Sequence, residues 1–200
     1  MATQDLFTSR NNGADGPTQV GQQGRVWYDS VTNVFRESDG VTPGGRIIGG
    51  ASISSLNQIG SFHSTETQTN LITQGNEFTY NVTDISNGIT IQNNSHITFA
   101  NAGRFNLQFS AQLDKTDSGQ DTVEIWLRKN SVDVPWTNTI IDVNNNNGKA
   151  VAAWNFIIEP SAGDYYELMW FSTDTSMRIL AQPVNSRPAV PSIILTVTHC

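Results

Sequence analysis

Hydrophobic and polar residues alternate along much of the chain from Gly60 onward. In the segment 104–114, every second residue from Phe105 to Leu113 is apolar and every residue between is polar. Successive side chains of a strand point to opposite faces, so this pattern predicts a strand with one face in a core and one in polar surroundings. Strands are predicted over 60–67, 77–83, 88–93, 95–100, 104–114, 121–129, 138–144, 149–158, 164–173, 176–182 and 191–199. Regular spacing of this kind, with Gly, Asn, Asp and Pro between the strands, is typical of an antiparallel all-β sandwich, and no helical period stands out.

Two segments, 150–158 and 164–171, break the alternation because both of their faces are apolar. Strands have this composition when both faces are buried. The core of a small sandwich covers one face, and a second copy of the chain is the simplest cover for the other. The candidate interface residues are Trp154, Tyr166, Leu168 and Trp170. The alternative is a monomer in which the N-terminal part of the same chain covers this face.

The first 49 residues have a different character. Residues 1–24 are rich in Gly, Asn, Gln and Asp and have little to bury, so we expect an extended arm that is ordered only by a partner surface. Residues 25–49 predict a small β unit, with strands over 25–29 and 33–37 and a turn at 30–32. A hairpin of this size is marginal in water, which predicts that it docks on another protein. The candidate docking residues are Trp27, Tyr28 and Phe35.

These patterns predict three parts. Residues 1–49 form an anchoring arm with the small β unit, residues 50–59 form a linker, and residues 60–200 form the sandwich domain. The linker is too short for the shaft of a long fibre.

The chain has few charged residues, and its acidic residues outnumber its basic ones. Charged residues make up 14% of the sequence, against roughly 25% in an average soluble protein. A neutral polar surface suits a protein that packs against copies of itself, where buried charge is costly. The formal net charge of −7, with scattered basic residues, argues against a nucleic-acid partner.

The sequence shows no signal peptide, no apolar run long enough for a membrane span and no pair of cysteines, since Cys200 stands alone. We therefore expect synthesis in a cytoplasm, no membrane insertion and, for a protein that acts outside a cell, exit by a route other than classical secretion, of which assembly into a virus particle released by lysis is one example.

The residues that could carry chemistry favour no enzyme, cofactor or metal. The three histidines lack the spacing of a metal site, and no nucleophile motif is present. The segment 142–148 partly matches a calcium loop, but its glycine falls one place late and no acidic residue closes it. A solvated hairpin loop is the favoured interpretation, and the same holds for the loop that contains Asp114, Asp117 and Asp121.

Two further possibilities concern binding and hydrolysis. If the domain binds a receptor or glycan, the candidate contacts are Trp136, Asn145 and Asn146, although Trp136 could equally cap the core. Glu124 and Asp164 are the candidate carboxylates for glycoside hydrolysis. For Asp164, a structural role in satisfying the amides of a turn is the stronger hypothesis.

Several stretches together resemble a known family. The segment 96–107, with 125–130, 162–167 and 191–197, resembles the trimeric jelly rolls of tumour necrosis factor and complement type, in the version used by tailed-bacteriophage virion proteins. The segments 24–29 and 38–45 are similar to modules at the base of phage fibres. The resemblance implies a homotrimer with Tyr166, Leu168 and Trp170 near the threefold axis, anchored to the particle by its N-terminal arm.

The sequence thus predicts a non-enzymatic virion protein, either a short fibre, a fibre tip or a capsid decoration knob, that binds itself and other virion proteins. The alternative function is a receptor- or glycan-binding module that acts through the loops of the jelly roll. A depolymerising enzyme with a carboxylate-lined groove is the least favoured alternative.

Overall fold

The structure, a computed structural model, describes residues 20–29, 34–48 and 58–200. The chain divides into two compact units, Met1–Leu56 and Asn57–Cys200. The predicted turn at 30–32 and most of the predicted arm and linker lie outside the described residues. The described part of the chain contains no helix that is long and apolar enough to span a membrane.

The first unit contains a three-stranded antiparallel sheet. Its strands, in the order β1-β2-β3, are β1 (Val26–Asp29), β2 (Val34–Glu37) and β3 (Arg46–Ile47). Trp27 is buried against Gly45, whose backbone has a φ of +65°. A Cβ at Gly45 would lie 2.4 Å from the Cη2 atom of Trp27, so only glycine leaves room for the indole.

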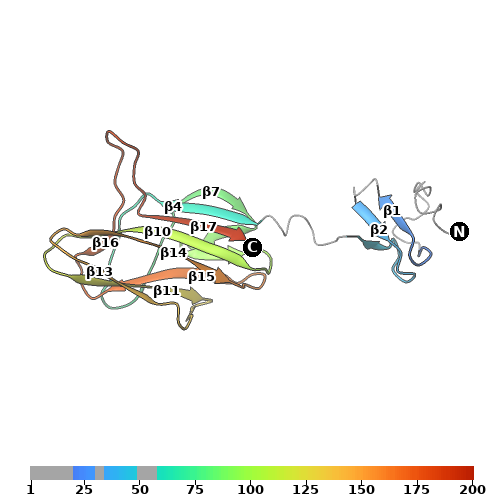
Figure 1. The fold of residues 1–200 in the computed structure, drawn as a ribbon, viewed down its shortest axis with the longest axis horizontal. Helices are drawn as coiled ribbons and strands as arrows, with labels where there is room; N and C mark the ends of the chain where they lie inside the picture. The colour runs from blue at the N-terminus through green and yellow to red at the C-terminus, as the bar shows by residue number, and fades with distance from the viewer. Residues whose placement is uncertain (1–19, 30–33, 49–57) are drawn as a thin grey trace. The chain divides into compact units, whose positions relative to one another are not determined.

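The second unit is a sandwich of two antiparallel sheets (Figure 1). The first sheet has the order β5-β16-β10-β17-β4-β7, and β14 pairs with the other edge of β10. Its strands are β4 (Ile59–Ser64), β5 (Gln68–Thr69), β7 (Val82–Asn87), β10 (Phe105–Lys115), β14 (Lys149–Ile158), β16 (Met177–Ile179) and β17 (Ile193–His199).

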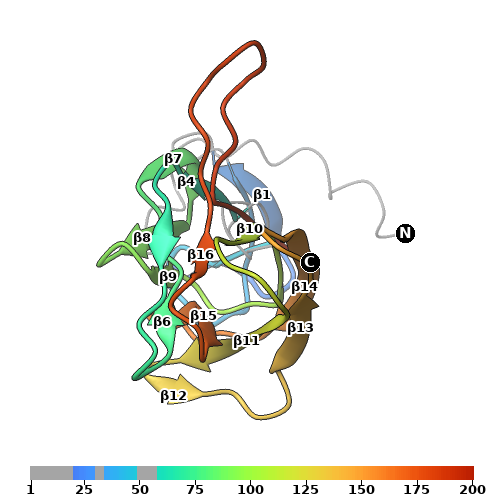
Figure 2. The ribbon, with the colours of Figure 1, turned by 90° about the vertical axis from the view of Figure 1, so that its left-hand side faces the viewer.

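The second sheet has the order β12-β11-β15-β9-β8, with β13 paired to β11 and β6 paired to β15. Its strands are β6 (Asn76–Glu77), β8 (Ile89–Gln92), β9 (His96–Phe99), β11 (Asp121–Lys129), β12 (Val132–Asp133), β13 (Thr139–Val143) and β15 (Tyr165–Ser172). Figure 2 looks at one end of the sandwich and shows the two layers with the core between them.

The strand order confirms the predicted jelly roll. The central strands β4-β17-β10-β14 form one layer and β9-β15-β11-β13 form the other, so the chain crosses repeatedly from layer to layer as two interleaved Greek keys do. The alternation predicted for 104–114 is confirmed in β10, where the residues Phe105, Leu107, Phe109, Ala111 and Leu113 are all buried. Asp114 departs from it, because its carboxylate is buried and paired with Lys149 and Arg178.

Two segments stand clear of the sandwich. Residues 182–189, between β16 and β17, are all exposed, and Gln182 pairs with Val190 at the base of this projection (Figures 1 and 2). On another side, the connection between β12 and β13 stands out beyond β11.

Prediction for the core. Leu107 is fully buried on the inward face of β10, so Leu107→Ala should lower the free energy of unfolding by about 2–5 kcal/mol through lost burial and the cavity left behind. The measurement is urea unfolding at one fixed protein concentration. Thr83→Ala, at an exposed position of β7, is the control and should change stability by less than about 0.5 kcal/mol. Equal effects of the two substitutions would contradict the assigned core.

Candidate functional site

Four neighbouring strands of the first sheet, β14, β10, β17 and β4, present an outer face without charge. The strand register places Ala153 and Ile194 on either side of Ser110, and all three point away from the core. The outward positions are Val151, Ala153, Asn155 and Ile157 on β14, Asn106, Gln108, Ser110 and Gln112 on β10, Ile194, Thr196 and Thr198 on β17, and Ile59, Ser61 and His63 on β4. None of them is Asp, Glu, Lys or Arg. We call this surface the neutral face.

The neutral face combines open apolar side chains with amides and hydroxyls. Val151 is 61% exposed, Ile157 59% and Ile194 42%. The amide of Asn155 donates to the Oδ1 atom of Asn106 across 2.8 Å. Charged side chains occur only at its borders, where Lys149 pairs with Asp114, Arg104 with Glu159, and Asp84 with His63. The sequence predicted that β14 has a second apolar face that needs a cover. The structure is consistent with this prediction, because apolar side chains on the outer face of β14 are exposed in the single chain.

In the second sheet, the outer face of β15 is covered by the same chain instead. Met169 is buried on this face, next to Trp126 across the strand pair. A Cβ at Gly75 would lie 2.7 Å from the Trp126 ring and 3.7 Å from the Met169 Cε atom, so the segment around Gly75 packs directly on both. Glu167 is also buried there, where its carboxylate accepts from Ser95 Oγ (3.2 Å) and lies 3.4 Å from His96 Nε2.

The predicted interface residues of β15 are core residues. Leu168 and Trp170 have no exposed surface and Tyr166 has 6%, and all three point into the space between the two sheets. For Leu168 and Trp170 the prediction of a place near the threefold axis is wrong, because no part of either side chain is left for a second copy to contact. The apolar pattern of β15 has another cause, namely that the chain covers both faces of this strand.

Trp154 also points toward the core but lies at the edge of the first sheet, partly buried. Its ring packs edge-on against Phe109 with centroids 4.6 Å apart, and its Nε1 atom is buried without a hydrogen-bond partner among the described residues. Its role in an interface stays a prediction.

Trp27, one of the predicted docking residues of the first unit, packs against Gly45 and is only 4% exposed. Tyr28 and Phe35 are exposed, and their rings contact each other with centroids 5.3 Å apart. The surface that this unit offers to a partner therefore contains Tyr28 and Phe35 but not Trp27.

The predicted receptor contacts do not form one patch. Asn145 and Asn146 are exposed in the β13–β14 turn, beside the Asp121 end of β11, whereas the loop of Trp136 is hydrogen-bonded to Leu127 near its other end. Six residues of strand separate Asp121 from Leu127, which corresponds to about 20 Å. The Trp136 side chain is fully exposed, so it does not cap the core.

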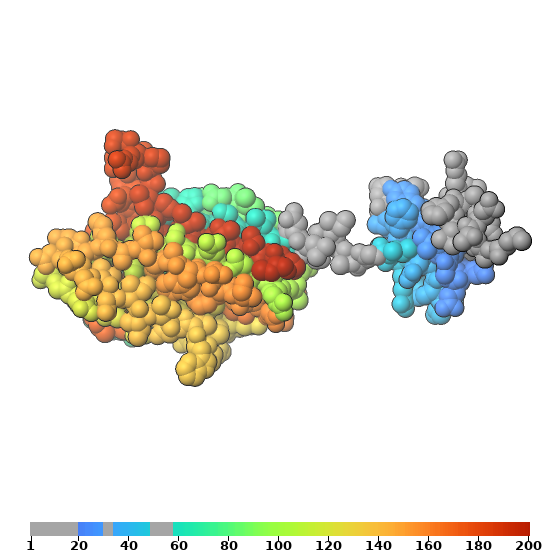
Figure 3. All heavy atoms as spheres, viewed as in Figure 1, coloured from blue at the N-terminus to red at the C-terminus, as the bar shows by residue number. Residues whose placement is uncertain are grey.

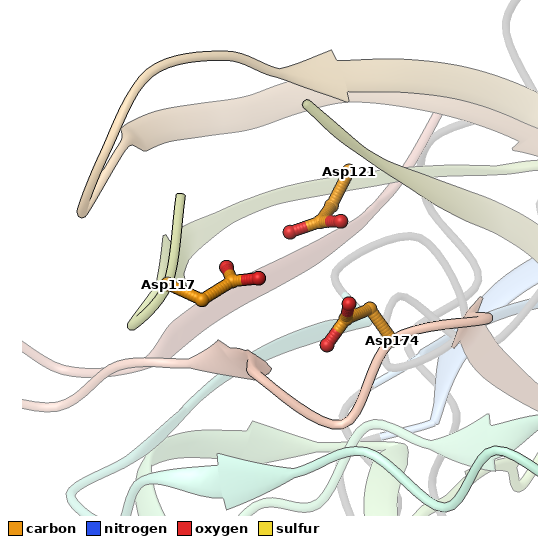
Figure 4. Close-up of side chains that lie close together, drawn as sticks. All are labelled: Asp117, Asp121 and Asp174. Atoms are coloured by element: carbon orange, nitrogen blue, oxygen red, sulfur yellow. The ribbon is translucent and has the colours of Figure 1, made fainter. Parts of the chain in front are cut away.

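Three carboxylates converge at the Asp121 end of β11, opposite the end near the Trp136 loop. Ligand oxygens of Asp117, Asp121 and Asp174 lie within 4.8 Å of one another (Figure 4). The sequence pattern pointed to Asp117 and Asp121 but grouped them with Asp114, which lies in the separate pair with Lys149 and Arg178. Asp174 comes from the β15–β16 connection, which sequence spacing gives no means of placing here.

An ammonium group of the chain already lies among these carboxylates. The Lys115 side chain is fully buried, with its Nζ atom 2.6 Å from Asp121 and 3.4 Å from Asp117, and it donates to the carbonyl of Gly119 at 2.9 Å. Burial alone would lower the pKa of Lys115, but the hydrogen bonds to Asp121 and Asp117 outweigh it and raise that pKa. The pKa of Asp117 is lowered by a hydrogen bond from Ser176 and by Lys115. Lys115 thus offsets one of the three negative charges of the cluster from within.

The two carboxylates considered for hydrolysis lie far apart. Asp164 accepts hydrogen bonds from the Ser161 amide and the Asn130 side chain and pairs with Lys129, and these contacts lower its pKa to about 2, with Lys129 the largest cause. This confirms its structural role in the turn. Glu124 lies on β11 six residues before Asn130, or about 20 Å away, well beyond the roughly 5–9.5 Å that glycoside hydrolysis requires.

Comparison with known proteins gives a likeness in structure but none in sequence. No protein-family model and no curated protein sequence matches the chain. Among solved structures, it is similar to the globular domain of the zebrafish complement 1qA protein, with 14% sequence identity, 72% of this chain and 96% of that chain covered, and a TM-score of 0.45. The assignment of the jelly roll rests on the strand order, and this likeness says nothing about a virion.

Prediction for the carboxylate cluster. Lys115→Met should lower the melting temperature at neutral pH, because it leaves Asp117, Asp121 and Asp174 without their internal cation. Added Ca²⁺ should restore part of the loss, since oxygen ligands from several carboxylates suit this ion. The measurement is thermal unfolding of wild type and variant in calcium and in chelator.

Lys149→Met is the matched control, because it removes an exposed lysine that pairs with Asp114 instead. Its melting temperature should not respond to calcium. The assignment of Lys115 as the internal cation fails if Lys115→Met and wild type respond to calcium alike.

Proposed function

We propose that the chain is a non-enzymatic structural protein of a phage virion, in which three copies join through their jelly-roll units and the first 49 residues anchor the trimer to the particle. The observation that carries this proposal is the neutral face. A short fibre, a fibre tip and a decoration knob all fit the short predicted linker.

The composition of the neutral face favours a subunit interface. Soluble surfaces usually mix charges of both signs, whereas the centres of protein interfaces are depleted of charged side chains. Here Val151, Ile157 and Ile194 are exposed within a surface that has amides and hydroxyls but no charge. In a symmetric assembly each copy presents the same patch, so a charged residue near the axis would face its own copies.

The sequence supports the proposed number of copies and the proposed place of the chain in a phage particle. The resemblance to trimeric jelly rolls of phage virion proteins suggests three copies, and the resemblance of segments 24–29 and 38–45 to fibre-base modules suggests the anchor. The exposed Tyr28–Phe35 pair of the first unit supports a docking role for that unit.

A second candidate function is receptor or glycan binding through the loops. The fully exposed indole of Trp136 favours it, because aromatic rings stack on sugars and anchor protein interfaces. The two functions are compatible, since a fibre tip can also bind a host surface.

Prediction for the assembly. The wild-type chain should have the mass of three copies by light scattering, and Ser110→Arg should have the mass of one. Ser110 lies in the middle of the neutral face, where an arginine from each copy would be buried without a partner. Circular dichroism should show the same β structure in both proteins.

Ile140→Arg is the matched control, because Ile140 is exposed on β13 of the second sheet, away from the neutral face. It should keep the trimer mass. A wild-type mass of one copy would refute the proposed assembly, and a trimer in Ser110→Arg would show that the copies meet elsewhere.

Prediction for the anchor. The double substitution Tyr28→Ser, Phe35→Ser should leave the trimer mass unchanged and remove the protein from purified particles, because it deletes the exposed aromatic pair of the first unit. The measurement is the amount of the protein per particle by quantitative mass spectrometry. Val41→Ser, which alters another exposed apolar residue of this unit, is the control. Normal incorporation of the double variant would place the anchor outside this pair.

A further inference from the structure

An apolar groove opens where the edges of the two sheets meet. It has a volume of about 380 Å³ and lies between β11 and the end of β14. Its apolar lining consists of Leu127, Val134, Phe156, Ile157, Ile158 and Tyr166. Thr137 and Glu159 add polar atoms to it. Because Ile157 also belongs to the neutral face, the groove is continuous with the surface proposed to join the copies.

Trp136 projects from the loop that borders this groove. Its side chain is completely exposed, which is unusual for so large an apolar residue. The connection that carries it stands out from the body of the sandwich in Figure 3, where it is gold. Tryptophan is favoured at the centres of interfaces, where it is the most common type of energetic anchor together with Tyr and Arg.

The backbone holds Trp136 in this exposed position. Its φ is +65°, a conformation that is unfavourable for bulky side chains, and the other described non-glycine residues with positive φ are all Asn or Ser. The loop is fixed by Thr137, whose Oγ1 atom donates to the Val134 carbonyl at 2.7 Å and accepts from the Leu127 amide at 3.1 Å. A strained turn that displays an indole to solvent points to a contact made outside the single chain.

We propose that Trp136 of one copy inserts into the groove of a neighbouring copy. This inference rests on the proposed assembly, because it needs copies that meet at or beside the neutral face. Each chain carries both halves of the contact, an exposed aromatic ring and an open apolar groove large enough for one. The groove also offers the carboxylate of Glu159, 65% exposed, as an acceptor for the indole N–H.

A second copy is favoured over an unrelated partner by the position of the groove. Ile157 is shared between the groove and the neutral face, so closing the copies on the neutral face brings the neighbour to the mouth of the groove. The same closure would bury the apolar lining that a single chain leaves open. The site is therefore incomplete without the partner copy, which contributes its Trp136.

Iodide quenching of tryptophan fluorescence tests this contact directly. The contribution of Trp136 is obtained as the difference between each protein and its Trp136→Phe counterpart. In the assembled wild type this contribution should be shielded from iodide, whereas in the single-copy variant Ser110→Arg it should be freely quenched. Equal quenching in the two proteins, with the wild type assembled, would overturn the proposed contact and leave Trp136 free for an outside ligand.

Trp136→Ala gives the energetic test. Loss of an anchoring tryptophan costs at least about 2 kcal/mol at a typical interface, so assembly should weaken by about 30-fold or more in sedimentation at decreasing concentration. The matched control is Val184→Ala in the other projecting segment, which should assemble as the wild type does. Unchanged assembly of Trp136→Ala would overturn the inference.

These measurements separate the two proposals. An assembled wild type with an exposed Trp136 keeps the trimer and removes the Trp136 contact. A wild type that stays a single copy at all concentrations removes both, because no neighbour is then present to receive the indole.

Discussion

The burial of one face of β10 is the constraint on which the rest of the jelly roll depends. β10 pairs with β14 along its whole length on one side and with β17 and β16 on the other, so it is the centre of the first sheet. Its five inward residues fill the space that the second sheet closes from the opposite side. A shift of the register by one residue would turn Asn, Gln and Ser side chains into the core, which makes the observed pairing the only favourable one.

The outer faces of the two sheets differ in what covers them. In the second sheet, the outer face of β15 is covered by its own chain, with Trp126 and Met169 packed beneath the segment around Gly75. Among the described residues, nothing covers the neutral face of the first sheet in this way, and Val151 and Ile157 are largely exposed. An uncovered sheet face that is neutral and partly apolar is suited to contact with another copy of the chain. This asymmetry, rather than the hydrophobicity of any one strand, is the basis of the proposed assembly.

The sequence predicted the jelly roll well because most strands carry a strong pattern, and β10, β11 and β14 lie within about a residue of their predicted bounds. It missed β7, an edge strand that pairs through its backbone and is exposed on both sides. It also assigned Leu168 and Trp170 to an interface, because alternation shows that two faces are apolar but not which segment covers each. The cluster around Lys115 could not be predicted from the sequence, since only the tertiary fold brings Asp174 close to Asp117 and Asp121.

The neutral face has a consequence for the environment in which the copies associate. A surface without Asp, Glu, Lys or Arg buries no carboxylate, ammonium or guanidinium group, so it leaves few charges for salt to screen. Association through this face is therefore governed by apolar burial and neutral hydrogen bonds. If the copies join through this face, the screening of charges by salt should change their affinity little.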